Sequence, residues 1–228
     1  MLHNMRVPRL APVDPAGNLS AQIYDTLLAA LVSGELAPGE TYSVPELAKH
    51  FEVSATPVRE AMLNLVNNGL LEPVKNKGFR VLIFSDEELD HIVYVRRLLE
   101  IPALVAAARV ATTSDIDHFR TIAEHCIRYA EEGNVIGYLE TDRRLHLDIL
   151  RLLGNDRLIA MVDQLRAQTR LFGLGSLADM GQLKHSAQEH LDLIDALGAK
   201  DEPRLRQLLD THIGHARGIW SNQPEQTN

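Results

Sequence analysis

Hydrophobic residues recur with helical spacing near the start of the chain. They form one stripe at Leu19, Ile23, Leu27, Ala30 and Leu31. This pattern predicts an amphipathic helix that begins at Leu19 and ends at Ser33-Gly34. Ser43 and Glu46 have the spacing of a capping box, which predicts a second, shorter helix that runs to about Phe51.

A third helix and a hairpin are expected to follow. The third helix is expected from Thr56 to Asn68, with Thr56 as N-cap and Pro57 at the first helical position. Residues 70–74 and 79–84 have the pattern of two short strands around the turn 75–78, Lys-Asn-Lys-Gly. A helix, a helix-turn-helix and a hairpin in this order are typical of a winged helix-turn-helix domain.

The pattern after Phe84 is helical throughout. Ser85 and Glu88 form a second capping-box pattern, which predicts a long helix to about Val110. Further helices are expected over residues 114–132, 135–153, 156–172, 183–198 and 202–220. The predicted fold class is therefore mainly α, with an antiparallel helical bundle as the second domain.

This pattern divides the chain into four parts. Residues 1–18 are punctuated by proline and are expected to be a flexible arm. Residues 19–84 form the winged helix, and residues 85–220 form the helical domain. The polar residues 221–228 are expected to be a disordered tail.

Composition narrows the class of protein. The 228 residues contain one cysteine, Cys126, which excludes an intramolecular disulfide and fits a reducing compartment. No apolar run approaches the ~20 residues that span a bilayer, so we expect no membrane segment and a cytoplasmic location. The net charge of −8 is uneven, because 7 basic and 8 acidic residues precede Ile83 and 16 basic and 23 acidic residues follow Leu82. The acidity therefore belongs to the helical domain.

Polar and basic residues gather where a recognition helix would begin. Ser54 and Thr56 carry hydroxyls suited to phosphates, and Arg59 can contact a guanine edge or a phosphate. Lys75 and Lys77 at the hairpin tip are expected to contact the flanking DNA backbone or minor groove. The alternative is that each of these side chains is ordinary solvated surface.

Three stretches in this region carry a resemblance to a known family: "SGELAPGE", "ELAKHFEVSATPVREAM" and "NNGLLEPVKNKGFRV". They closely resemble the DNA-binding domain of the GntR family of bacterial transcription regulators. The resemblance implies a winged helix that acts as a homodimer on an inverted-repeat operator in double-stranded DNA, with Arg59 as a contact to bases or phosphates. Many members have arginine where this chain has Ala55, so one operator contact is expected to be absent.

Histidines and an aspartate in the helical domain form a second pattern. Asp142 and His146 are four residues apart and share a helix face, while His190 and His212 lie on later helices. One aspartate and three histidines suit a divalent transition metal, Zn²⁺ first and also Ni²⁺, Mn²⁺ or Fe²⁺. His185 and His215 compete for the same role, whereas His91, His118 and His125 are interpreted as surface or packing residues. An exposed pair or a structural hydrogen bond is the other explanation for Asp142 and His146.

The region from about Glu88 to Trp220 resembles the FCD effector domain of the FadR subfamily. Metal-binding members of that subfamily use an Asp-x-x-x-His pair on one helix and one histidine on each of two later helices. The resemblance assigns these ligands to Asp142 and His146, to His190 in "SAQEHLDLIDAL" and to His212 in "LLDTHIGHA". His215 lies one turn beyond the match and is treated as a neighbour.

Arg96 and Arg97 border the apolar stripe of the first long helix. A buried arginine needs an anionic partner, so one of them either pairs with Glu100 or binds the carboxylate of an effector. In the family, the arginine four residues before this glutamate often lies in the effector pocket, which corresponds to Arg96.

The sequence therefore predicts a DNA-binding transcription regulator, with repression relieved by a small carboxylate at a metal site as the family-level expectation. Two alternatives remain open. One is a metal-dependent hydrolase, for which the chain offers no nucleophile elbow and no phosphate-binding glycine loop. The other is an effector-insensitive DNA binder whose metal is purely structural.

Overall fold

The computed structural model describes residues 10–11, 18–172 and 180–221. The chain divides into two compact units, residues 1–84 and 85–228. The residues 1–9, 12–17 and 222–228, which make up most of the expected arm and tail, lie outside the described part of the chain.

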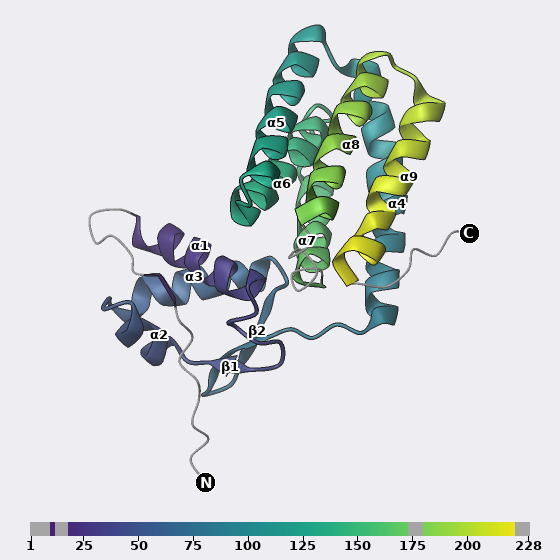
Figure 1. The fold of residues 1–228 in the computed structure, drawn as a ribbon. Helices are drawn as coiled ribbons and strands as arrows, with labels where there is room; N and C mark the ends of the chain where they lie inside the picture. The colour runs from purple at the N-terminus through teal and green to yellow at the C-terminus, as the bar shows by residue number, and fades with distance from the viewer. Residues whose placement is uncertain (1–9, 12–17, 173–179, 222–228) are drawn as a thin grey trace. The chain divides into compact units, whose positions relative to one another are not determined.

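The first unit contains three helices and a small sheet. The helices are α1 (Leu19–Val32), α2 (Val44–His50) and α3 (Ala55–Asn67), and the strands are β1 (Thr41–Tyr42), β2 (Leu71–Val74) and β3 (Gly78–Val81). Their core consists of buried side chains from every helix, among them Ile23, Leu27, Leu47, Val58, Met62 and Leu65. This arrangement confirms the predicted winged helix-turn-helix (Figure 1).

The sheet has the order β1-β3-β2, and β3 pairs antiparallel with both neighbours. Tyr42 lies opposite Phe79, and Leu71 lies opposite Val81. Gly78 at the start of β3 has φ +124°, and a Cβ there would collide with the backbone of Tyr42. Only glycine therefore lets β1 approach β3 this closely.

Strand β1 was not predicted from the sequence, and several boundaries of the other elements differ from the predicted ones. Helix α3 begins at Ala55 with Ser54 in the N-cap position, so the prediction of Thr56 as N-cap was wrong. Strand β3 ends at Val81 rather than at residue 84. Helix α5 begins at Thr113 rather than at residue 114, and it is capped by Thr112, which forms with Asp115 a capping box that was not predicted from the sequence.

The second unit is a bundle of long helices within its described residues (Figure 1). They are α4 (Asp86–Val110), α5 (Thr113–Glu131), α6 (Val135–Arg151), α7 (Asp156–Phe172), α8 (Met180–Gly198) and α9 (Glu202–Ser221). Helix α5 packs on α6 and α8, and α4 packs on α9 and α7. The predicted capping box of Ser85 and Glu88 is present at the start of α4. The core that these helices share includes Leu104, Phe119, Leu145, Ile194 and Leu209.

The structure confirms the predicted fold class. Among the described residues, no helix combines the length and the apolar character that a membrane span requires.

Candidate metal centre and DNA-binding surface

The residues predicted to contact DNA are exposed at two places in the first unit. Ser54, Thr56 and Arg59 lie at the N-terminal end of α3, and Lys75 and Lys77 lie in the turn between β2 and β3. The Ser54 side chain makes no capping hydrogen bond, so no N-cap side chain occupies the first backbone N–H groups of α3. Free N–H groups at a helix start suit a phosphate oxygen, and Arg59, the fifth residue of α3, follows them directly.

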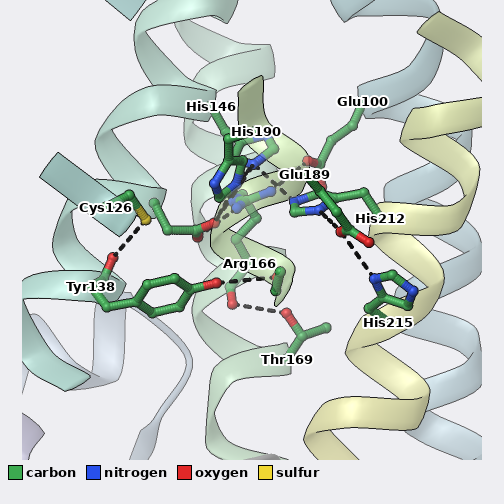
Figure 2. Close-up of polar contacts among 12 residues, drawn as sticks. Glu100, Cys126, Tyr138, His146, Arg166, Thr169, Glu189, His190, His212 and His215 are labelled. Atoms are coloured by element: carbon green, nitrogen blue, oxygen red, sulfur yellow. Dashed lines mark hydrogen bonds and ion pairs between the residues drawn. The ribbon is translucent and has the colours of Figure 1, made fainter. Parts of the chain in front are cut away.

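Four predicted ligand residues meet in the interior of the second unit. Helix α6 carries Asp142 and His146, α8 carries His190 and α9 carries His212. All four side chains are buried, and one nitrogen or oxygen from each lies within 4.8 Å of the others. Figure 2 shows the imidazole rings of the three histidines turned toward one another.

The distances between these atoms are short. Nε2 of His146 lies 3.3 Å from Nε2 of His190 and 3.2 Å from Nε2 of His212. Oδ1 of Asp142 lies 3.2 Å from Nε2 of His190 and 3.7 Å from Nε2 of His146. In a tetrahedral site with metal–nitrogen bonds of ~2.0–2.1 Å, ligand atoms lie about 3.3 Å apart. The four donor atoms therefore have the spacing of a metal coordination shell.

The chemistry of the donors also fits a cation. Burial lowers the pKa of His146 well below its usual value, with the positive charge of Arg166 adding to the effect. Burial also lowers the pKa of His212, although Glu189 opposes this shift. An imidazole nitrogen without a proton offers one lone pair, and a carboxylate oxygen only accepts, so the three Nε2 atoms and Oδ1 of Asp142 can present four lone pairs to one centre. A divalent cation would accept all four lone pairs.

A buried ionic network connects Asp142 to α4. Arg166 on α7 donates through Nη2 to Oδ2 of Asp142 at 2.7 Å and through Nη1 to Oε2 of Glu100 at 2.9 Å. Arg96 donates through Nε to Oε1 of Glu100 at 2.5 Å and through Nη1 to Oγ1 of Thr169 at 3.1 Å. Since two guanidinium groups and two carboxylates are paired here, the charges balance within the network.

The pKa values in this network follow from that pairing. Burial by itself would raise the pKa of Glu100, but the charges of Arg96 and Arg166 outweigh it and lower the pKa. Burial opposes the charge of Arg166, yet Asp142 and Glu100 raise its pKa above the usual value. Both carboxylates of the network therefore face a permanent cation.

A second polar group lies on the other side of His212. Oε2 of Glu189 on α8 lies 2.9 Å from Nδ1 of His212 and 3.0 Å from Nδ1 of His215 (Figure 2). The exposed His185 approaches the other carboxylate oxygen at 3.6 Å. Glu189, His212 and His215 thus form a second group with possible metal-ligand spacing.

The other predicted residues lie elsewhere. Arg97 contacts Asp210 on α9, with Nε 2.9 Å from Oδ1, and is not part of the four-residue cluster. His91, His118 and His125 are exposed, and His118 contacts Asp148. Arg96 pairs with Glu100, as one of the two interpretations of the sequence had it.

Arg166 and Glu189 were not predicted as site residues from the sequence. The sequence contained a signal for Arg166, because Val162, Arg166 and Thr169 have the spacing of one helix face. The structure shows that this face of α7 is buried. Glu189 had no comparable signal, because its two histidine partners belong to α9, a different helix.

The fold and the site together define a class of protein, a regulator in which a DNA-binding winged helix is followed by a helical domain. The helical domain contains a buried cluster of potential metal ligands, one aspartate and three histidines. Comparison with protein families agrees. Residues 19–81 match the model of bacterial regulatory proteins of the gntR family, and residues 91–215, more than half of the chain, match the FCD domain. The chain belongs to the GntR family and carries an FCD domain as its second unit.

Similar proteins span nearly the same length. The chain is 28% identical over 194 residues to the HTH-type transcriptional regulator McbR of Escherichia coli, with 84% of this chain and 88% of McbR covered. It is 26% identical over 198 residues to a probable D-xylose utilization operon transcriptional repressor of Paenarthrobacter nicotinovorans, with 86% and 85% covered. A structure of E. coli McbR/YncC superposes with a TM-score of 0.74 at 27% identity, over 91% of this chain and 99% of that one.

Family membership assigns the general function. The chain is a DNA-binding transcription regulator and not an enzyme. FCD domains can bind metal, and this one has a buried cluster of histidines and an aspartate.

Proposed function

We propose that the protein is a repressor whose affinity for its operator is controlled by a small carboxylate that binds beside a divalent metal. The observation that carries this proposal is the convergence of Asp142, His146, His190 and His212 in the interior of the FCD domain. Zn²⁺ is our first choice of ion, and Ni²⁺, Mn²⁺ or Fe²⁺ fit the same donors. We expect the protein to act in the cytoplasm.

The proposed DNA contacts lie at the start of α3 and in the hairpin turn. Arg59 would contact a base edge or a phosphate in the major groove, with Ser54 and Thr56 on the neighbouring backbone. Lys75 and Lys77 would contact the flanking phosphates or minor groove. We propose that the protein binds as a homodimer, which matches an inverted-repeat operator because each winged helix takes one half-site.

The metal would polarise and hold a carboxylate oxygen of the effector, as Lewis-acidic ions do. Asp142, His146, His190 and His212 would hold the metal. Arg96 would supply the positive charge that binds the effector's carboxylate. Among the described residues its hydrogen-bond partners are Glu100 and Thr169, so an effector carboxylate could take the place of Glu100. Nε of Arg166 is also buried and has no partner among the described residues. A carboxylate effector would find a hydrogen-bond donor there, and it could compete with Glu100 for Arg96.

We assign the effector contact to Arg96 and place Arg97 outside the pocket. Arg97 was the second candidate in the sequence, but its guanidinium contacts both the side chain and the backbone oxygen of Asp210. The guanidinium of Arg97 is already paired with Asp210 on α9, so we do not expect it to bind an effector at the four-residue cluster.

The ionic network offers a route from the cluster to the winged helix. Asp142 contacts Arg166, Arg166 contacts Glu100, and Glu100 belongs to α4. Helix α4 begins at Asp86, directly after the first unit of the chain. An effector that displaces Glu100 from Arg96 would change the packing of α4, and a small rotation there would change the fit of a dimer to two half-sites.

The test uses an operator selected from random duplexes by the wild-type protein. Fluorescence anisotropy then measures the affinity for this duplex with zinc or with a chelator, while hydroxy- and dicarboxylates are titrated. We expect at least one carboxylate to change the affinity about tenfold, which corresponds to ~1.4 kcal/mol of coupling. This response should disappear in His190→Ala and in Arg96→Ala. If no carboxylate alters the affinity of the zinc-loaded protein, the proposal is wrong.

One observation favours a structural metal as the second candidate. The four donors come from α6, α8 and α9, so one ion would cross-link three helices. In that case the metal-free protein unfolds more readily, but partly loaded samples bind carboxylates no differently. The DNA footprint would then be the same with and without effector.

A further inference from the structure

Glu189 lies at the back of one predicted metal ligand. It precedes His190 on α8, and its side chain is 17% exposed. Its Oε2 contacts Nδ1 of His212, the ring nitrogen that faces away from the cluster. His215 contacts the same oxygen from one turn further along α9.

This contact fixes which nitrogen of His212 carries the proton. A carboxylate without a proton can only accept hydrogen bonds, so the Nδ1 that contacts it is the donor. Oε2 of Glu189 lies 2.9 Å from Nδ1 of His212 and 3.0 Å from Nδ1 of His215, so both ring nitrogens are within hydrogen-bond distance of the same acceptor. A neutral His212 with its proton on Nδ1 has its lone pair on Nε2, which points toward the other donors.

The other two histidines lack such a partner. Nδ1 of His146 and Nδ1 of His190 are buried and make no hydrogen bond within the described residues. Of the three imidazoles, His212 is therefore the one that a carboxylate orients from behind.

Glu189 also differs from the other acidic groups near the cluster. Asp142 and Glu100 are each paired with a buried arginine. Among the described residues, the ion-pair partners of Glu189 are histidines. Its negative charge is therefore not balanced by a guanidinium, and it favours a cation at the far side of the His212 ring.

We propose that Glu189 is a positioning residue of the metal centre, which holds His212 in the tautomer and orientation that present Nε2 to a divalent ion. The proposal rests on the proposed metal site. A carboxylate behind a ligating histidine raises the basicity of the ligand, and removing such a partner costs ~10–100-fold in metal affinity.

The first experiment measures zinc affinity by competition with a chromophoric chelator. Glu189→Ala is expected to weaken zinc binding by ~10–100-fold without changing the stoichiometry. Glu189→Gln keeps an oxygen acceptor but loses the charge, so its loss should be smaller than that of the alanine variant. Gln188→Ala, an exposed neighbour on the same helix, is the matched control and should bind zinc within about twofold of wild type.

His215→Ala separates the two contacts of Glu189. It leaves the bond between Glu189 and His212 in place, so zinc affinity should fall less than in Glu189→Ala. An equal loss in both variants would overturn the assignment to the Glu189–His212 pair.

The second experiment reads the tautomer of His212 in the metal-free protein by ¹⁵N–¹H correlation spectra of the imidazole ring. The wild type should show the Nδ1–H form, and Glu189→Ala should show a mixture of both tautomers. A mere loss of packing would leave the tautomer unchanged, and circular dichroism checks that each variant is folded.

Two results contradict the proposal. One is wild-type zinc affinity together with a wild-type His212 spectrum in Glu189→Ala. The other is the loss of one whole zinc equivalent in Glu189→Ala, which would make Glu189 a direct ligand of a second ion with His215. If the wild type binds no zinc, the proposed function fails instead, while the spectra still test the orientation of His212.

Discussion

Two arginines on two helices show how differently the two units use the same side chain. Arg59 on α3 is exposed, whereas the side chain of Arg166 on α7 is 4% exposed and contacts two carboxylates. An exposed guanidinium is free to bind a phosphate, and the binding free energy of that contact decreases as the salt concentration rises. In the interior it must be paired, and its removal leaves uncompensated negative charge.

The units also differ in how their functional residues are assembled. The proposed contacts at the start of α3 lie between residues 54 and 59, in the N-cap position and the first five residues of one helix. The predicted metal ligands extend from Asp142 to His212 and come from three helices. A surface for DNA can be local, but a buried cation needs donors from several directions.

The largest effect is expected from breaking the buried pairing. Arg166→Met should lower the free energy of unfolding by ~3–5 kcal/mol, because Glu100 and Asp142 lose a shared cation inside the bundle. Urea denaturation followed by circular dichroism measures this. Arg157→Met, an exposed arginine on the same helix, should change stability by less than ~0.5 kcal/mol. Similar values for both variants would mean that the burial of Arg166 has no energetic role.

Zinc should stabilise the helical domain by the next largest amount. At a free concentration 100 times its dissociation constant, a ligand that binds only the folded state adds ~2.7 kcal/mol. Thermal unfolding with zinc and with a chelator measures the difference. The gain should be lost in His190→Ala and in His212→Ala and kept in His125→Ala, an exposed histidine of the same unit. Equal stabilisation of all variants would place the ion elsewhere.

The recognition helix should show a smaller, sequence-dependent effect. Arg59→Ala is expected to weaken binding to the selected operator by ~1–3 kcal/mol if Arg59 reads a base. Anisotropy titrations with operator and scrambled duplex measure affinity and specificity. Arg144→Ala, an exposed arginine of the bundle, is the control and should leave both unchanged. Unaltered binding by Arg59→Ala would exclude it from the interface.

The smallest effect is expected at the wing. Lys75→Ala and Lys77→Ala should each weaken binding to all duplexes to a similar degree and lower the slope of log affinity against log salt by about 0.9. Binding measured between low and moderate salt tests this. A slope equal to that of wild type would show that the lysine does not contact a phosphate.

Much of the fold could be predicted from local pattern. The Ser85 and Glu88 capping box gave the start of α4, and residues 156–172 were predicted as the helix that the structure contains. Local patterns succeed here because a cap or an amphipathic stripe acts over only a few residues. Strand β1 was missed because two residues carry no period, and it exists only through its pairing with β3.

The sequence by itself determined the helices, the winged helix and the residue types of the candidate ligands, because spacing along a helix decides which side chains share a face. Only the tertiary structure decided that Asp142, His146, His190 and His212 converge, that Arg166 binds Asp142, and that Glu189 lies behind His212. These contacts join residues on different helices, and the packing of the helices fixes their distances. No periodicity along the chain records that packing.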